Sequence, residues 1–128
     1  MRTTPSVAFV SIFLVAVGLA WAALWNGYPM VFSGDTGAYI EGGIVSVDKR
    51  WLSIAWSRPP FYNLFLYLTQ WRWSLWPAVF AQALLLSHLL WLMHKTVHGD
   101  VAPARFLVTS AALVCLSTAP WFVGLLLP

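Results

Sequence analysis

Residues 73–93 read WSLWPAVFAQALLLSHLLWLM, a run of 21 residues without a charged side chain. The chain contains two further uncharged runs, 32 residues long from 3 to 34 and 23 residues long from 106 to 128. About 20 consecutive apolar residues cross the hydrocarbon core of a bilayer as a helix, so each run is long enough for one span. We therefore predict three transmembrane helices, over about residues 7–25, 77–93 and 106–127.

The composition is typical of a membrane protein. Hydrophobic residues make up 60% of the 128 residues and charged residues 9%, whereas a soluble domain has about 25% charged residues. The net charge of +3 comes from scattered basic residues, which do not form the clustered footprint of a nucleic-acid-binding protein. Cys115 is the single cysteine, so an internal disulfide is impossible.

The predicted fold class is an all-α integral membrane protein. It has three transmembrane helices and one long loop, residues 26–74, which carries one or two interfacial helices. Residues 1–128 form one membrane region, and we expect it to be the amino-terminal part of a larger multi-span protein. A cleaved signal peptide is the alternative for the first span, because Ala20-Trp21-Ala22 resembles a cleavage site. Against it, the apolar run exceeds the roughly 7–15 residues typical of such a signal.

The long loop divides into two predicted parts. Its first part is rich in turn residues because of four glycines, Gly34, Gly37, Gly42 and Gly43, and residues 44–54 fit a short interfacial helix. Ser57 is placed to cap a second helix, with Pro59 and Pro60 in its first turn. This second helix is expected to lie in the interface on one apolar face, formed at the i, i+3, i+4, i+7 spacing by Phe61, Leu64, Phe65 and Leu68.

The histidines and the basic residues are weaker indications of a metal site and of the orientation in the membrane. His88, inside the second span, is expected to hydrogen-bond a neighbouring helix. Residues 94–100 are predicted to form a short loop, in which His94 and His98 are four residues apart. Two imidazoles without further ligands are a weak sign of a metal site. Basic residues are nearly balanced between the two sides of the spans, so charge leaves the orientation open.

Asp35 and Glu41 are the first acidic residues beyond the first predicted span. A partly desolvated carboxylate at a membrane surface is a good proton acceptor, as a general base requires. Glu41 is placed to position a substrate or bind a cation. The alternative for Asp35 is a turn residue, because Ser-Gly-Asp-Thr-Gly is good turn sequence.

Arg58 precedes two prolines, which stiffen the backbone around it. A guanidinium held in a fixed pose is a forked donor for phosphate. The alternative is an arginine at a helix start whose charge reaches the headgroups.

An acid after the first span, followed by Arg58-Pro59-Pro60-Phe61-Tyr62, resembles the amino-terminal part of the GT-C superfamily of membrane glycosyltransferases. This superfamily includes protein O-mannosyltransferases and lipid A aminoarabinose transferases. The resemblance implies a polyprenyl-phosphate-linked sugar as donor and inverting transfer to an acceptor hydroxyl or amine. It implies that Asp35 is the general base, that Arg58 binds the donor phosphate, and that Glu41 and Tyr62 help to bind substrate. The chain departs from the family at Thr36, where a second acid often stands.

The resemblance also implies an extracytoplasmic loop in a bacterial-type inner (plasma) membrane. The partners it implies are the bilayer, the polyprenyl-phosphate sugar and further membrane helices. The resemblance is compatible with a divalent metal cofactor and does not require one. The alternative function is a small non-enzymatic membrane subunit or assembly factor that docks through its tryptophan-rich loop. A transporter is less favoured, because the predicted spans lack the charges that transporters usually hold there.

Overall fold

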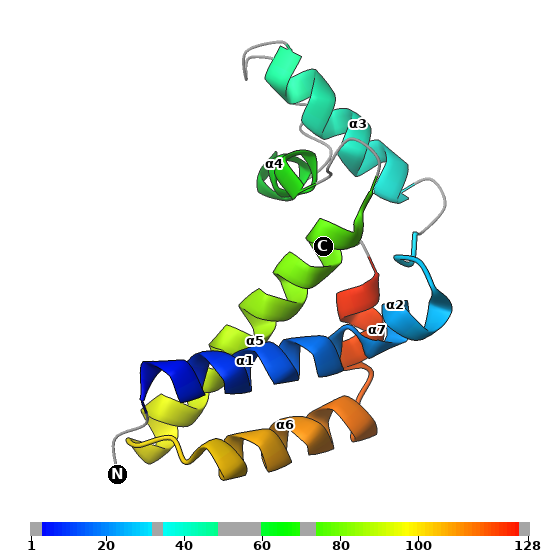
Figure 1. The fold of residues 1–128 in the computed structure, drawn as a ribbon. Coiled ribbons are helices and arrows are strands. Elements are labelled where there is room, and N and C mark those ends of the chain that lie inside the picture. Colours follow the sequence, from blue (N-terminus) through cyan, green and yellow to red (C-terminus); the bar gives the residue numbers. More distant parts are fainter. Residues whose placement is uncertain (1–3, 32–34, 49–59, 70–73, 126–128) are drawn as a thin grey trace.

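The computed structural model describes residues 4–31, 35–48, 60–69 and 74–125. Within these ranges the chain is helical and has no strand, which confirms the predicted all-α fold (Figure 1). The helices are α1 (Pro5–Leu19), α2 (Trp21–Asn26), α3 (Asp35–Asp48), α4 (Pro60–Thr69), α5 (Trp76–His98), α6 (Pro103–Leu116) and α7 (Ala119–Gly124). The prediction for Ser57 and Pro59 lies outside the described residues.

Helices α1 and α2 continue each other in nearly the same direction (Figure 1). The backbone N–H of Ala20 donates to the carbonyl of Ala16, and that of Leu24 donates to the carbonyl of Ala20. The helical hydrogen-bond pattern therefore crosses the junction. At about 1.5 Å per residue, residues 5–26 extend over roughly 33 Å. Gly27 ends the pair with a φ of 78°.

Helix α5 contains 23 residues and is, within the described part of the chain, the single helix that is long and apolar enough to cross a membrane. The predicted loop over 94–100 is wrong for residues 94–98, because α5 continues to His98, and only Gly99 and Asp100 lie outside the helix. The chain leaves the helix at Gly99, whose φ is 73°. The added turns are stabilised by packing, since the His94 ring lies edge-on to Phe106 of α6.

The predicted single helix over residues 106–127 is also wrong. Helix α6 begins earlier, at Pro103, and ends at Leu116, and α7 follows after a break at Ser117 and Thr118. Pro120 explains the break. Its ring would clash with the carbonyl of residue 116 in a continuous helix, and it has no N–H to donate to that carbonyl. The Ser117 hydroxyl stabilises the turn by donating to the carbonyl of Leu113 and accepting from the N–H of Ala119.

The glycine-rich segment predicted to be turns is instead the first part of α3, which begins at Asp35. Glycines are poor helix formers, but here they allow α3 and α4 to approach closely. A Cβ atom on Gly43 would lie 2.6 Å from the backbone oxygen of Asn63, and one on Gly42 would lie 2.7 Å from the Asn63 side chain. Tertiary contact therefore overrides the local preference for turns.

Helix α4 begins at Pro60, and the apolar face predicted to lie in the membrane interface is exposed at its two ends. Phe61 is 84% exposed and Leu68 is also exposed, whereas Asn63 and Leu66 are buried. The spacing identified a real apolar stripe. In the structure its two ends, Phe61 and Leu68, lie on the outer surface of α4, whereas Phe65 packs against the hydrophobic core. Helix α4 contacts α3 and α5.

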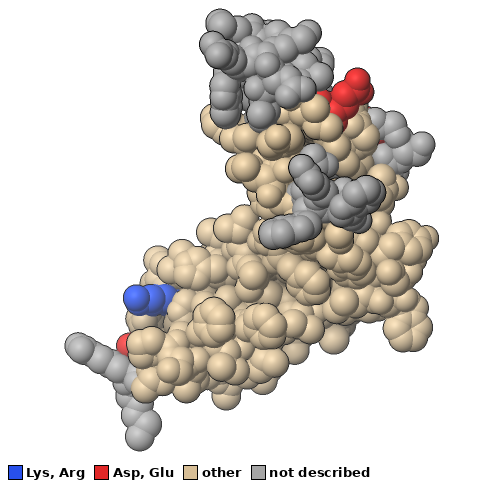
Figure 2. Space-filling view, turned by 45° about the horizontal axis from the view of Figure 1, so that its top comes forward, with Lys and Arg blue, Asp and Glu red and all other residues tan. Residues whose placement is uncertain are grey.

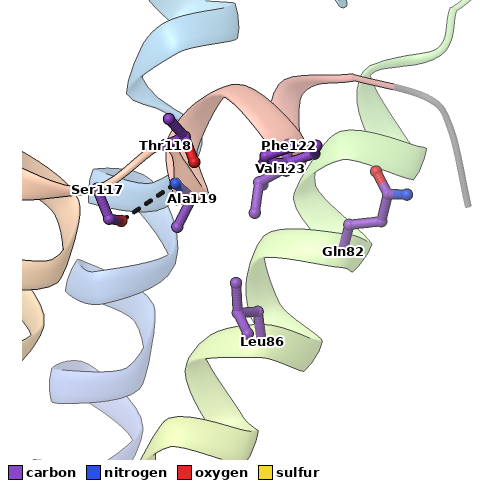
Figure 3. Close-up of a pocket in the computed structure, with 7 residues that line it drawn as sticks. All are labelled: Gln82, Leu86, Ser117, Thr118, Ala119, Phe122 and Val123. Carbon is purple, nitrogen blue, oxygen red and sulfur yellow. Dashed lines mark hydrogen bonds between the residues drawn. The ribbon is translucent and has the colours of Figure 1, made fainter.

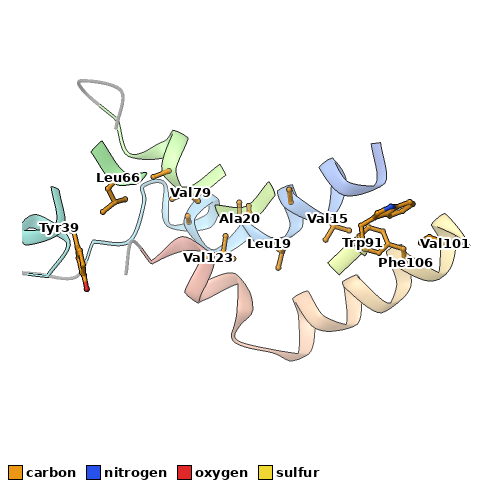
Figure 4. Close-up of a cluster of buried hydrophobic side chains, with 14 residues drawn as sticks. Val15, Leu19, Ala20, Tyr39, Leu66, Val79, Trp91, Val101, Phe106 and Val123 are labelled. Carbon is orange, nitrogen blue, oxygen red and sulfur yellow. The ribbon is translucent and has the colours of Figure 1, made fainter. Parts of the chain in front are cut away.

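One elongated hydrophobic core joins the helices (Figure 4). At one end Leu66 and Tyr39 join α4 and α3, and at the other Trp91 of α5 lies edge-on to Phe106 of α6, with ring centroids 5.0 Å apart. Between these ends α1 packs on α5. There the buried Ser87 hydroxyl donates to the carbonyl of Ile12 over 2.6 Å.

Charged residues are separated into two groups along the molecule. Within the described ranges they occur only in α3 and between Lys95 and Arg105, at the α5–α6 turn. The face in Figure 2 accordingly shows coloured side chains at its two ends and an uncharged surface between them. Many exposed apolar side chains of α1 and α5 lie in this uncharged region.

Candidate functional site

The candidate site begins at Asp35, the half-buried first residue of α3. A carboxylate is favourable there, because the amino end of a helix carries partial positive charge. Residues four apart lie on the same helix face, so Tyr39 follows Asp35 on this face, about 6 Å further along the axis. Tyr39 is buried against α4.

Three helices meet at Tyr62. Its ring lies edge-on to Tyr39 of α3, with centroids 5.2 Å apart and an interplanar angle of 87°. Gln82 of α5 donates a hydrogen bond from Nε2 to the Tyr62 Oη over 3.0 Å. Tyr39, Tyr62 and Gln82 therefore form a polar cluster in otherwise apolar surroundings, and Asp35 lies one helical turn away from it.

Burial raises the pKa of the Tyr62 hydroxyl above its ordinary value of 10.0. The hydrogen bond from Gln82 lowers this pKa, and the nearby Tyr39 raises it. Desolvation disfavours the charged phenolate, so Tyr62 is a neutral phenol at physiological pH. It is thus suited to hydrogen bonding.

We expect Tyr62→Phe to lower the free energy of unfolding by about 1–3 kcal/mol near neutral pH, because Gln82 loses its partner. The folded pKa is raised, so the stabilisation by Tyr62 is present below pH 10.0 and is lost as the pH rises through the folded pKa. The difference between the two proteins should therefore shrink above pH 10.0. Unfolding of both proteins in detergent micelles, at pH values below and above 10.0, measures this difference in the free energy of unfolding. Tyr28→Phe, which changes an exposed ring, is the control. A difference that grows with pH would contradict the assignment.

Two amide oxygens near the cluster have no hydrogen-bond partner among the described residues: Asn63 Oδ1 and Gln82 Oε1. Asn63 is only 3% exposed. An unpaired buried polar atom costs about 1–3 kcal/mol. Reversing the Gln82 amide would leave its nitrogen unpaired instead, so either orientation leaves one polar atom to be satisfied. Such atoms mark a place where a ligand hydroxyl or amide could bind.

A groove of about 520 Å³ extends from Gln82 along α5 to the α6–α7 break (Figure 3). Its lining is mainly apolar and includes Leu86, Phe122 and Val123, with Ser117 and Thr118 at the break. Gln82 is the residue shared by the groove and the polar cluster. The arrangement suits an amphipathic ligand.

Among the predicted site residues, Tyr62 contacts Tyr39, and Asp35 precedes Tyr39 by one turn of α3. Glu41 is exposed, and six residues from Asp35 correspond to about 120° around the helix, so it lies on another face of α3. Arg58 lies outside the described residues.

Sequence reasoning missed Tyr39, Asn63 and Gln82. The available signals were the four-residue spacing from Asp35 to Tyr39, and a single amide within each of two apolar helices. Those signals are weak because their meaning depends on which helices meet.

Metal ligands are sparse in the described part of the chain, where no group of three or more His, Cys, Asp or Glu side chains is placed to hold one ion. The site therefore offers one carboxylate, two phenols and two amides. These groups can bind hydroxyls, and Asp35 can accept a proton.

Comparison with known proteins gave no match: no protein-family model, no curated protein and no solved structure is significantly similar to this chain.

Proposed function

We propose that this chain carries the acceptor-activating region of a membrane glycosyltransferase that uses a polyprenyl-phosphate-linked sugar. The observation that carries the proposal is the position of Asp35 at the start of α3, one turn from the cluster of Tyr39, Tyr62 and Gln82. A carboxylate beside hydroxyl-binding groups and an apolar groove suits the activation of a hydroxyl or amine next to a lipid-linked donor.

The proposal includes three membrane crossings: α1 with α2, α5, and α6 with α7. Its support is the uncharged, apolar surface between two charged ends. The interrupted third crossing is compatible with a bilayer if other protein covers the break. The end with α3 and α4 would face the outside of a bacterial-type inner membrane, and the apolar stripe of α4 would lie on lipid.

In the proposed reaction Asp35 takes the proton of the acceptor hydroxyl or amine. The acceptor atom then bonds to the anomeric carbon as the bond from that carbon to the phosphate oxygen breaks. Polyprenyl phosphate leaves with the bonding electrons, and the configuration at the anomeric carbon inverts. Arg58 is proposed to bind the phosphate, and Tyr62 to bind substrate. Glu41 is given no role, because it lies on a different face from Asp35.

We expect Asp35→Asn to lower the transfer rate by about 10²–10⁴-fold, the usual contribution of general base catalysis. The assay follows release of labelled sugar from polyprenyl phosphate by membranes that contain the protein. Glu41→Gln is the matched control, since it removes a carboxylate from the same helix, and it should keep most of the activity. Full activity in Asp35→Asn membranes would remove Asp35 from the mechanism.

The second candidate, a non-enzymatic membrane subunit, is favoured by the open apolar groove beside the α6–α7 break. It predicts that wild-type membranes transfer no sugar and that the chain co-purifies with a defined membrane protein. The substitution Ala119→Trp, which fills the groove with a larger side chain, should then release that protein, whereas Asp35→Asn should not.

A further inference from the structure

The two histidines at the end of α5 lie at the opposite end of the molecule from Asp35. Because α5 continues to His98, His94 and His98 occupy successive turns of one helix face. Their ring centroids are 5.4 Å apart and the rings are tilted by 49°. His94 is half-buried and His98 is exposed, so the pair is open to solvent on one side.

The His94 ring is held in place by α6. Its Nε2 lies 2.8 Å from the Thr109 Oγ1. The carbonyls of Arg105 and Phe106 lie 2.9 and 3.1 Å from the same hydroxyl. In the tautomer in which Thr109 donates to these carbonyls, it accepts from the His94 Nε2–H, and the Nδ1 lone pair of His94 is free to bind a metal ion. The edge-on contact with Phe106, 5.6 Å between centroids, fixes the ring further.

This arrangement has the features of half a metal site. Two imidazoles on one tetrahedral zinc ion, with zinc–nitrogen bonds of about 2.0–2.1 Å, place their ring centres about 5 Å apart. Histidines that bind metals usually donate their other ring N–H to an oxygen, and the Thr109 Oγ1 is an oxygen within hydrogen-bond distance of the His94 Nε2. The carboxyl end of a helix also carries partial negative charge, which favours a cation.

We propose that His94 and His98 bind a divalent transition-metal ion at the α5–α6 turn, with water in the remaining positions. Binding would fix the last turn of α5 relative to α6 through the bond from His94 to Thr109. The charged residues of this end, Lys95, Asp100 and Arg105, are exposed, so solvent and salt screen their effect on the ion. The inference is independent of the proposed transferase activity.

The test is a calorimetric titration of the untagged, purified chain in detergent micelles with Zn²⁺ alone. We expect one zinc ion per chain. Either His94→Asn or His98→Asn should abolish binding, and His88→Asn, at an exposed histidine of the same helix, should leave it unchanged.

Thr109 is a positioning residue in this proposal. Thr109→Val should weaken zinc binding by about tenfold, and Thr109→Ser, which keeps the hydroxyl, should restore it. Helical content by circular dichroism shows whether each variant folds. Absence of zinc binding by the wild-type chain, or equal loss in His88→Asn and His98→Asn, would overturn the site. Unchanged binding in both Thr109 variants would overturn the role of Thr109.

Discussion

Replacing Phe106 with alanine is expected to lower the free energy of unfolding by about 3–5 kcal/mol, the range for deleting a buried aromatic side chain. Phe106 is 0% exposed and joins α6 to α5. Its ring lies edge-on to Trp91 and contacts His94, so it fixes the turn between α5 and α6. Alanine would leave a cavity at the end of the core, with Trp91 unsupported.

Denaturant unfolding in detergent micelles, followed by tryptophan fluorescence, measures this loss. Phe122→Ala is the matched control, since Phe122 is 69% exposed, and surface substitutions usually change stability by within about 0.5 kcal/mol. Similar losses in the two variants would mean that Phe106 is not a core residue.

The second large effect is expected at Gly43. A Cβ there would lie 2.6 Å from the Asn63 backbone oxygen and 2.9 Å from the Cβ of Tyr67. Because one of these atoms belongs to the backbone, α3 and α4 would have to separate. We expect Gly43→Ala to destabilise their contact by about 1–3 kcal/mol, as overpacking does, although alanine is the better helix former by about 1 kcal/mol.

Gly37→Ala, on the same helix, is expected to change the stability in the opposite direction. A Cβ at Gly37 has no atom within 4 Å, so only the gain in helix propensity remains. Hydrogen exchange of the α3 and α4 amides should therefore become faster in Gly43→Ala and slower, or unchanged, in Gly37→Ala. Equal protection in both variants would show that the close approach at Gly43 is absent.

The candidate site was predictable in part. Asp35 stood out as an acid directly after an apolar run, and Tyr62 as part of an aromatic segment after two prolines. Their common neighbour Tyr39 and the partner Gln82 could not be found, because a hydrogen bond between residues 20 apart depends on how α4 meets α5. Glu41 is a carboxylate, as the predicted substrate-binding role requires, but it lies on a different face of α3 from Asp35 and Tyr39.

The sequence by itself determined the helical fold and the separation of charges, because long apolar runs without Asp, Glu, Lys or Arg leave few other arrangements. It also placed Pro60 in the first turn of a helix, where α4 begins. Only the tertiary structure decided the rest. Gly42 and Gly43 are helical because α4 packs against them, and α5 extends to His98 against α6. At each glycine, the contact between distant segments outweighs a local preference of about 1 kcal/mol against the helix.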